Sequence, residues 1–472
     1  MSSEHVGYIV QIKELQKHPN ADRLQIAIIF GNSVIVDLKT KIGDLGVFFP
    51  IDLQLSEEYC RENDLVRRKD ENGNAAGGYL DPNKRNIRAM RFRGSPSEGL
   101  FLPLDTLTYT GKTQFEVGEK IDNINGHEIC CKYIPRSSTH ESTRKLGNKV
   151  RKKKTPIAPL FVEHADTEQL AYNLDAFRAG DIIEITLKMH GTSGRTGYLP
   201  KLQGYKRTLL DRILRKEGTP IYDWGYVNGT RRVVLKDFDN GFYGDNSFRE
   251  PHAKFFEGKL NKGETVYYEI VGFMTSGTPI MPTALNNKIS DKAFVKQYGP
   301  ITTFSYGCAS KPFHDSVKDK DILQSDIYVY RMTMTNEDGD VVEYSPDYMR
   351  YRCDQIGVKY VPVLWRGIIP SVNSDGLVRS DDFVADENGQ FIEWIFKTPG
   401  EYIKDIAEQY YDGPDPIGET HVREGVVIRI VNRPRFSAYK HKNFSFKVLE
   451  GIAKDLAAAP DIEEAQEIIE EE

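Results

Sequence analysis

The chain has 472 residues, a length that favours two or three domains over a single one. Hydrophobic residues make up 39% and charged residues 28% of it, which excludes disordered and fibrous classes of protein. The net charge of −6 excludes a uniformly basic nucleic-acid-binding protein. The charge is nevertheless uneven, because residues 144–154 are strongly basic and residues 461–472 are strongly acidic.

The cysteines and the apolar stretches indicate the cellular compartment of the protein. The five cysteines have no metal-site spacing and their number is odd, so we expect a reducing compartment rather than a disulfide framework. The first residues show no signal-peptide pattern. No apolar run approaches the ~20 residues of a membrane span. We therefore expect a cytoplasmic protein, a monomer, that does not enter a membrane.

Residues 1–126 consist of short β-branched or aromatic stretches punctuated by Gly, Asn and Pro, and helical periodicity is nearly absent. A small closed barrel buries such strands without leaving open edges, so we predict a barrel here. The predicted strands are 6–13, 24–30, 33–38 and 45–49.

Three segments follow the predicted barrel. Residues 127–159 are rich in Ser, Thr, Lys and Arg with little periodicity, which indicates a basic linker. Residues 160–450 mix strands and helical stretches and are predicted to form a second domain, in which the insert 345–411 is the least explained part. Residues 451–472 are predicted to be an acidic helical tail. The clearest strands are 181–187, 265–273, 327–333 and 424–431, and the clearest helical stretch is 402–409.

The segment around Lys188 carries the most chemical information. A strand rich in Ile and Leu ends at Lys188, and Gly191 follows three residues later. A lysine in that position lies at the mouth of a sheet, with its amine directed into a cleft. To act as a nucleophile the amine must be neutral, a form that burial or neighbouring cations favour. Taken alone, the pattern is better explained by an ordinary lysine at a strand end.

The stretch Lys188-Met189-His190-Gly191 resembles the nucleotidyltransferase motif of the covalent superfamily of DNA ligases, RNA ligases and capping enzymes. The variant with His190 in place of the usual Asp resembles phage-type RNA ligases of the second family. Further stretches resemble the other motifs of the superfamily, in the same order, over about 255 residues. They are 229–232, 267–272, 327–331 with 361–364 beyond it, 423–429 and 439–443.

The resemblance implies a role for each motif residue. Lys188 takes up AMP as a lysyl-adenylate, Arg231 contacts the phosphates and Tyr330 stacks on adenine. For the stacking role, Phe304 and Tyr306 are rival candidates. The implied catalytic residues are Lys188, His190, Glu424, Lys440 and Lys442. The implied nucleotide-binding residues are Lys188, Gly191, Arg231, Glu269, Tyr330, Glu424, Lys440 and Lys442.

The implied roles are chemically consistent. Lys440 and Lys442 are two residues apart on a predicted strand, so both project from one face and can meet the α-phosphate. Glu269 and Glu424 border apolar strands, where a buried carboxylate needs a partner such as a metal ion or a ribose hydroxyl. Both are candidate metal ligands, and the sequence does not apportion the two roles. His190 either contacts phosphate, orients the acceptor, or replaces the superfamily's Asp structurally.

Two stretches of the first domain, 18–24 and 93–100, resemble the signatures of the tRNA-binding OB-fold found on some aminoacyl-tRNA synthetases. Between them, arginines alternate approximately with apolar residues, so a strand would aim several at one face. Positive surfaces with aromatic residues are how OB-folds engage single strands. The resemblance implies the fold but not tRNA specificity. The predicted nucleic-acid-binding residues are Arg85, Arg88, Arg91 and Arg93.

The order of the domains narrows the resemblance. An OB-fold placed before the nucleotidyltransferase domain resembles RNA ligases of the Deinococcus type, whereas DNA ligases and capping enzymes carry theirs after it. Few residues follow the motif 439–443, so we expect no trailing OB-fold. The predicted fold class is therefore α+β, an OB-fold β-barrel followed by an ATP-grasp-like ligase domain of antiparallel sheets and helices.

The expected function is an ATP-dependent RNA ligase that joins 3′-hydroxyl and 5′-phosphate ends through lysyl-AMP and 5′-adenylated nucleic acid, in the repair of RNA. The expected cofactors are ATP and Mg²⁺ or Mn²⁺, and the expected partner is RNA or a nicked duplex that contains RNA. A DNA ligase of the same chemistry and a non-catalytic RNA-binding protein on the ligase fold are the alternatives. A tRNA function of synthetase type rests on the first domain alone.

Overall fold

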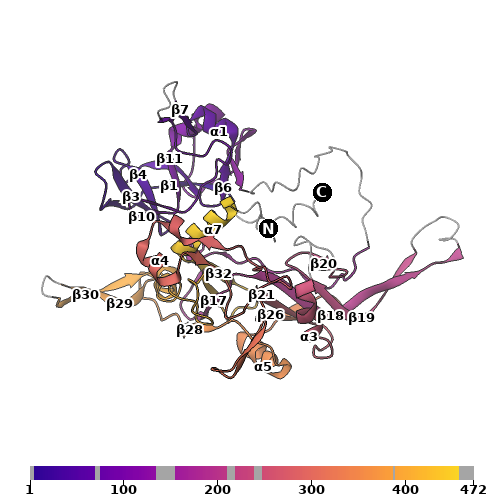
Figure 1. Ribbon diagram of the computed structural model, residues 1–472. Helices are drawn as coiled ribbons and strands as arrows, with labels where there is room; N and C mark the ends of the chain where they lie inside the picture. The colour runs from indigo at the N-terminus through magenta and orange to yellow at the C-terminus, as the bar shows by residue number, and fades with distance from the viewer. Residues whose placement is uncertain are drawn as a thin grey trace. The chain divides into compact units, whose positions relative to one another are not determined.

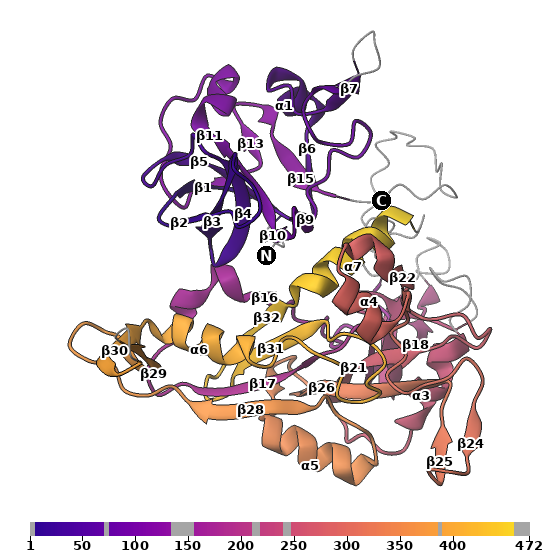
Figure 2. The ribbon, with the colours of Figure 1, turned by 60° about the vertical axis from the view of Figure 1, so that its left-hand side comes forward.

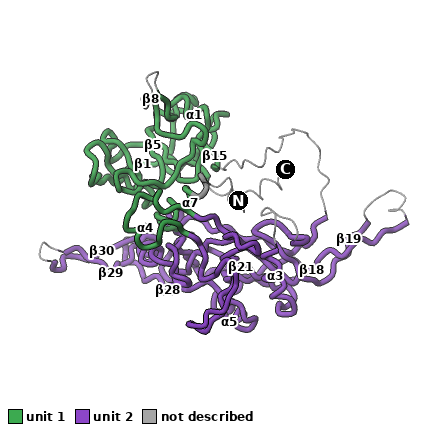
Figure 3. Tube along the Cα trace, in the orientation of Figure 1, with its two compact units in different colours: residues 1–137, 284–302, 442–460 green, residues 138–283, 303–441, 461–472 purple. Residues whose placement is uncertain are grey.

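The computed structural model describes residues 5–69, 75–133, 155–209, 218–238, 247–385 and 389–456. The chain forms two compact units (Figure 3). Unit 1 comprises residues 1–137, 284–302 and 442–460, and unit 2 comprises residues 138–283, 303–441 and 461–472. The basic stretch 144–154 and the acidic stretch 461–472 lie outside the described residues.

Unit 1 is built mainly from short antiparallel strands. The four predicted strands are present as β1 (Gly7–Gln11), β3 (Leu24–Ile29), β4 (Asn32–Asp37) and β5 (Leu45–Pro50). One sheet has the order β11-β5-β1-β12 and another β2-β3-β4. The added strands are β2 (Leu15–Lys17), β11 (Gly99–Pro103) and β12 (Lys120–Ile121). Buried apolar side chains such as Ile9, Val47 and Phe49 form its core.

Helices complete unit 1, and two of them start at a side-chain cap. The Ser56 side chain accepts the backbone N–H of Tyr59 at the start of α1 (Glu57–Glu62). Asp291 caps α4 (Lys292–Tyr298) in the same way. The helix α7 (Phe444–Leu456) contacts the short strand β22 (Ala284–Leu285). Segments from three distant parts of the sequence therefore share unit 1.

Unit 2 contains two sheets. The five-stranded sheet has the order β16-β32-β31-β17-β28, which Figure 2 shows, and the six-stranded sheet has the order β20-β19-β18-β21-β26-β27. The strands of the first sheet are β16 (Glu168–Gln169), β17 (Ile182–Lys188), β28 (Val363–Ile368), β31 (Gly425–Ile430) and β32 (Ala438–Lys442). Those of the second are β18 (Thr192–Lys206), β19 (Thr219–Gly229), β20 (Val234–Leu235), β21 (Glu264–Gly272), β26 (Ser325–Thr335) and β27 (Val341–Glu343).

The strand β17 has one apolar and one polar face. Ile183 and Ile185 are fully buried in a core shared with β31. Because successive side chains of a strand alternate between faces, Glu184, Thr186 and Lys188 share the opposite face. Antiparallel pairing places Lys188 directly opposite Gly425 at the start of β31.

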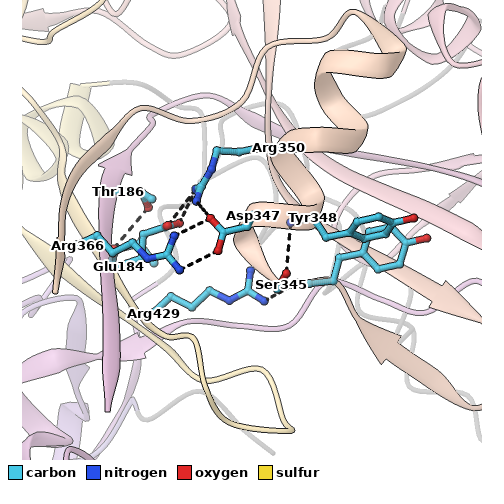
Figure 4. A network of polar contacts seen from close by, with 10 residues as sticks. Glu184, Thr186, Ser345, Asp347, Tyr348, Arg350, Arg366 and Arg429 are labelled. Atoms are coloured by element: carbon cyan, nitrogen blue, oxygen red, sulfur yellow. Dashed lines mark hydrogen bonds and ion pairs between the residues drawn. The ribbon is translucent and has the colours of Figure 1, made fainter. Parts of the chain in front are cut away.

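A network of ion pairs holds the polar face of β17 (Figure 4). Glu184, which is 3% exposed, receives hydrogen bonds from Arg350 at 3.0 and 2.9 Å, and Arg350 also donates to Asp347 at 2.7 Å. Arg366 of β28 donates to both oxygens of Asp347, at 2.6 and 2.8 Å. Asp347 and Arg350 lie on α5 (Pro346–Ile356), so the network ties this helix to β17 and β28.

The insert 345–411 contains regular structure beyond α5 and β28. The strands β29 (Val378–Ala385) and β30 (Phe391–Lys397) pair in a hairpin, and α6 (Pro399–Glu408) follows. The predicted helical stretch 402–409 corresponds to α6, which begins at a capping box formed by Thr398 and Glu401. In Figure 1 this hairpin and the longer β18–β19 hairpin extend from opposite sides of unit 2. No helix in the described part of the chain has the length and apolarity that a membrane span requires.

Candidate active site

Lys188 ends β17 and forms an ion pair with a buried carboxylate. Its Nζ lies 2.7 Å from Oε1 of Glu424, whose side chain is only 2% exposed, whereas that of Lys188 is 22% exposed. The pairing of Lys188 with Gly425 explains this contact, because Glu424 immediately precedes β31. A charge-assisted hydrogen bond removed from water fixes the position of the amine.

His190 lies beside the same carboxylate. Its Nδ1 is 3.6 Å from Oε2 of Glu424. Its backbone N–H donates to the hydroxyl of Tyr306 at 2.7 Å, and its ring meets that of Phe304 edge-on at a centroid distance of 4.5 Å. Both aromatic residues are buried, and burial raises the pKa of Tyr306 well above its ordinary value. The two rival candidates for adenine stacking thus pack around His190.

A second histidine, His421, contacts the same two aromatic rings. His421 is fully buried, and its ring centroid is 4.5 Å from that of Tyr306 and 5.2 Å from that of Phe304. Burial lowers the pKa of His421. The buried carboxylate of Asp415 accepts backbone N–H groups of its own loop, including that of Gly418 at 2.7 Å. Sequence reasoning missed both residues, because no motif marks either one.

Gly191 lies where only a glycine fits. A Cβ at this position would come within 2.3 Å of the backbone oxygen of Ile270. The N–H of Gly191 donates to Oε1 of Glu269 at 3.1 Å. The loop 188–191 thus contacts both candidate carboxylates, Glu424 through Lys188 and Glu269 through Gly191.

Arg231 follows β19 and is paired with an acid. Its Nε donates to Oδ1 of Asp166 at 3.0 Å, and Arg232 meets the other oxygen of Asp166 at 3.3 Å. Burial raises the pKa of Asp166, but the neighbouring guanidinium of Arg231 outweighs it, and the net shift is downward. The predicted phosphate-binding arginine is therefore held in place by a carboxylate that the sequence did not indicate.

Tyr330 lies at a β-bulge. The register between β21 and β26 pairs Tyr267 with Arg331 and Tyr268 with Val329, which leaves Tyr330 as the extra residue. Bulges re-aim a side chain and are frequent beside functional sites. The hydroxyl of Tyr330 is 3.1 Å from Nδ1 of His164.

Arg195 of β18 has a structural role. It is 1% exposed, and its guanidinium donates to four backbone oxygens. These are Phe161 at 3.2 Å, Val162 at 2.6 Å, Thr230 at 2.9 Å and Arg232 at 3.0 Å. By binding carbonyls on both sides of Arg231, Arg195 fixes the loop that carries it.

Lys440 and Lys442 lie on β32, on one face of the strand. Lys440 is opposite Gln169 in the register with β16. The amine of Lys442 donates to both oxygens of Glu450 in α7, at 3.0 and 2.8 Å, and both side chains are largely buried. Between the two lysines, His441 stacks on Tyr411 at a centroid distance of 4.8 Å.

The carboxylates of Glu424 and Glu269 suit a metal site that is shared with a nucleotide better than a site made of protein ligands alone. Within the described ranges, no group of three or more His, Cys, Asp or Glu side chains is placed to hold a metal ion. Mg²⁺ does not require such a group, since it is usually bound by one or two carboxylates together with substrate phosphates and water. Glu424 and Glu269 fit this second arrangement.

The four arginines predicted to bind nucleic acid differ in their surroundings. Arg85 donates to the backbone oxygen of Leu55 at 3.1 Å, and Arg91 is 3.5 Å from Asp291. Arg93 is exposed and Arg88 is half-buried. No single strand carries all four: within residues 85–93 only β9 (Met90–Phe92) is a strand, and Arg85 and Arg93 have φ of 48° and 46°.

Known structures share this fold. A family model described as an OB-fold domain matches residues 6–104. The RNA ligase of Naegleria gruberi with PPi is 17% identical, with a TM-score of 0.53 over 94% of this chain and 97% of its own. The chain has the fold of an RNA ligase. Mutant forms of that ligase with ATP and Mn and with AMP and Mn give TM-scores of 0.50 and 0.52 at 16% identity, over 93% of this chain and 98% and 97% of theirs.

The RNA-ligase fold confirms the predicted α+β class and the amino-terminal OB-fold. A comparison with curated protein sequences gives no match. At 16–17% identity the likeness establishes the fold alone, so the chemistry has to be argued from the side chains of this chain.

Proposed function

We propose that this chain is an ATP-dependent RNA ligase that joins 3′-hydroxyl and 5′-phosphate ends through a lysyl-adenylate on Lys188. The observation that carries the proposal is the pairing of Lys188 with the buried Glu424 at 2.7 Å, with His190 beside the same carboxylate. The pair lies within the fold of an RNA ligase whose solved structures include complexes with ATP, AMP and PPi.

In the first step the neutral amine of Lys188 attacks the α-phosphate of ATP. A nitrogen–phosphorus bond forms, the bond from the α-phosphorus to the bridging oxygen breaks, and pyrophosphate leaves. Glu424 is the acceptor placed to take the proton that the amine loses. Positioning and charge are most of what a protein contributes to such a transfer, and Arg231 and Arg232 supply positive charge.

In the second step an oxygen of a 5′-phosphate end attacks the adenylate phosphorus and releases Lys188. In the third step the 3′-hydroxyl attacks the activated 5′-phosphate, and AMP leaves. A bound Mg²⁺ or Mn²⁺, held by Glu424 or Glu269 together with the nucleotide, would reduce the negative charge that each attack meets. Lys440 and Lys442 are proposed to act as further cations at the α-phosphate.

The proposed nucleic-acid partner is RNA or a nicked duplex that contains RNA. The amino-terminal OB-fold supports this choice, because such domains track a single strand along a positive surface. Arg93 is the exposed member of the predicted basic set, and the other three are half-buried. We propose that this sealing reaction serves RNA repair.

The first test is incubation with α-labelled ATP and Mg²⁺. The wild-type protein should become covalently labelled, and Lys188→Ala should abolish the label, because it removes the amine that is paired with the buried Glu424 at 2.7 Å. Lys318→Ala, which changes an exposed lysine elsewhere in unit 2, is the matched control and should label normally. An unlabelled wild-type protein would favour the non-catalytic RNA-binding alternative.

The second test gives the labelled protein a nicked duplex whose 3′-hydroxyl strand is either RNA or DNA. With RNA, and not with DNA, we expect the label to leave the protein and be released as AMP while the nick is sealed. Equal sealing of DNA would replace the proposal by the DNA-ligase alternative, since the two differ only in contacts to the 2′-hydroxyl.

A further inference from the structure

The segment 158–166, here called the strap, is fastened to the six-stranded sheet of unit 2. The backbone oxygens of Phe161 and Val162 accept hydrogen bonds from Arg195, and the hydroxyl of Tyr267 also donates to Val162, at 3.0 Å. The backbone N–H of His164 donates to the oxygen of Arg231 at 3.2 Å. These bonds fix the course of the strap up to His164.

The strap touches two of the residues proposed to bind ATP. Its Asp166 pairs with Arg231, on the side of the phosphates. Its His164 meets Tyr330, on the side of the base: Nδ1 is 3.1 Å from the hydroxyl, and the two rings are perpendicular at a centroid distance of 5.4 Å. A bulge re-aims the side chain of the extra residue, and the contact with His164 holds the re-aimed ring of Tyr330.

The surroundings of His164 keep its imidazole neutral. Burial is the largest cause that lowers the pKa of His164, and the positive charges of Arg231 and Arg331 come next. Together with a contribution from Lys188, they lower this pKa to about 3. A neutral imidazole has one donor and one acceptor nitrogen, so it can bond the Tyr330 hydroxyl without adding a charge next to the phosphate-binding arginines.

We infer that His164 is a positioning residue of the nucleotide site, which orients the ring of Tyr330 for stacking on the adenine of ATP. The inference deepens the proposed function and rests on it. His164 was not among the candidate residues of the sequence, since it precedes the first motif and belongs to no pattern. Its contact with Tyr330 joins residues that are far apart along the chain.

The test compares His164→Ala, Tyr330→Phe and the double variant in the formation of the labelled adenylate. Each single change removes the same hydrogen bond and should raise the KM for ATP about three- to tenfold, with kcat changed less than twofold. Because both changes break the same hydrogen bond, the KM for ATP of the double variant should be no higher than that of the more impaired single variant. His164→Gln, which retains a neutral hydrogen-bonding group, should recover part of the affinity.

Two further measurements separate positioning from a general loss of structure. Inhibition of labelling by adenosine should weaken in His164→Ala, while inhibition by pyrophosphate should stay as in the wild type. His314→Ala, in an exposed hairpin of unit 2, is the control and should leave both unchanged. An unchanged KM in His164→Ala, or effects of the two single changes that multiply in the double variant, would overturn the inference. A wild-type protein that takes no label would instead overturn the proposed function.

Discussion

At Lys188 the chemistry depends on a carboxylate that lies far away in the sequence. Glu424→Gln keeps the size of this side chain and removes its charge, so the amine loses both its ion-pair partner and its nearest proton acceptor. We expect formation of the adenylate to fall by about 10²–10³-fold, as for other single electrostatic groups in active sites. The measurement is the initial rate of labelling by α-labelled ATP.

Glu337→Gln is the matched control for this change, because Glu337 is exposed in a turn of the same unit. It should label at the wild-type rate. A Glu424→Gln protein that labels as fast as the control would show that the ion pair is structural, and the proton of Lys188 would need another acceptor.

Gly191→Ala tests the close approach between the loop 188–191 and β21. The new methyl group would lie 2.3 Å from the backbone oxygen of Ile270, which cannot move without shifting β21. We expect a loss of about 1–3 kcal/mol in the free energy of unfolding and a strong loss of labelling. Gly204→Ala, where an added Cβ has nothing within 4 Å, should change neither quantity. Denaturant unfolding and the labelling rate together check both variants.

The sequence predicts neighbouring residues of the site better than distant ones. Lys188, His190 and Gly191 stand in one short motif, so their proximity follows from the chain itself. Tyr306 contacts His190, and His164 contacts Tyr330. In each pair the two residues are more than a hundred positions apart in the sequence. No local pattern marks such partners, because a single aromatic or histidine residue is more often an ordinary core residue.

At the scale of elements, ion pairs join α5 to the five-stranded sheet. Hydrogen bonds from Arg366, and then from Arg350, lower the pKa of Asp347 from 3.8 to about 2. An acid whose pKa is lower in the folded state stabilises the fold above its unfolded pKa, near 4. That stabilisation is lost as the pH falls from about 4 through about 2.

Asp347→Asn should therefore reduce the loss of unfolding free energy between about pH 4 and pH 2, relative to the wild type. Asp347 is 59% exposed on its side chain, so we expect a change of at most about 1 kcal/mol. Urea unfolding at several pH values is the measurement, and Asp338→Asn, in an exposed turn, is the control. Parallel pH profiles for wild type and Asp347→Asn would contradict the predicted role of the network.

Strands with a clear apolar, β-branched pattern could be predicted from the sequence. Strand boundaries that depend on the φ angle of a single residue could not. The apolar and β-branched stretches at β1, β3, β4 and β5 were found where the pattern placed them. The alternation of arginines before and within β9 suggested one strand. Positive φ at Arg85 and Arg93 breaks that strand, and neither residue type announces such a conformation.

At the scale of the whole molecule, the sequence did not indicate that residues 284–302 and 442–460 join the amino-terminal part in unit 1. The contacts responsible are single side chains. Lys447 of α7 pairs with Glu98 at 2.7 Å, and Arg91 lies 3.5 Å from Asp291. Charges of both signs are common on any surface, so no pattern in the sequence selects these pairs.

The contacts of Arg91 lead to a final prediction, which separates its two possible roles. Its guanidinium lies against Asp291 and over the ring of Phe444 at 5.0 Å, and its side chain is 23% exposed. Arg91→Ala should lower the unfolding free energy by about 1–2 kcal/mol, because a cation–π contact and an ion pair are lost together. Arg93→Ala, at an exposed position, should leave stability nearly unchanged.

Binding of a labelled single-stranded RNA at several salt concentrations completes the comparison. Arg93→Ala should weaken binding and reduce the salt dependence by about one phosphate contact, while labelling by ATP persists. Arg91→Ala should weaken RNA binding less than Arg93→Ala does, because its charge is already neutralised by Asp291. If Arg91→Ala instead left stability intact and abolished RNA binding, Arg91 would be an RNA ligand, as the sequence alone predicts, and its contacts within unit 1 would be secondary.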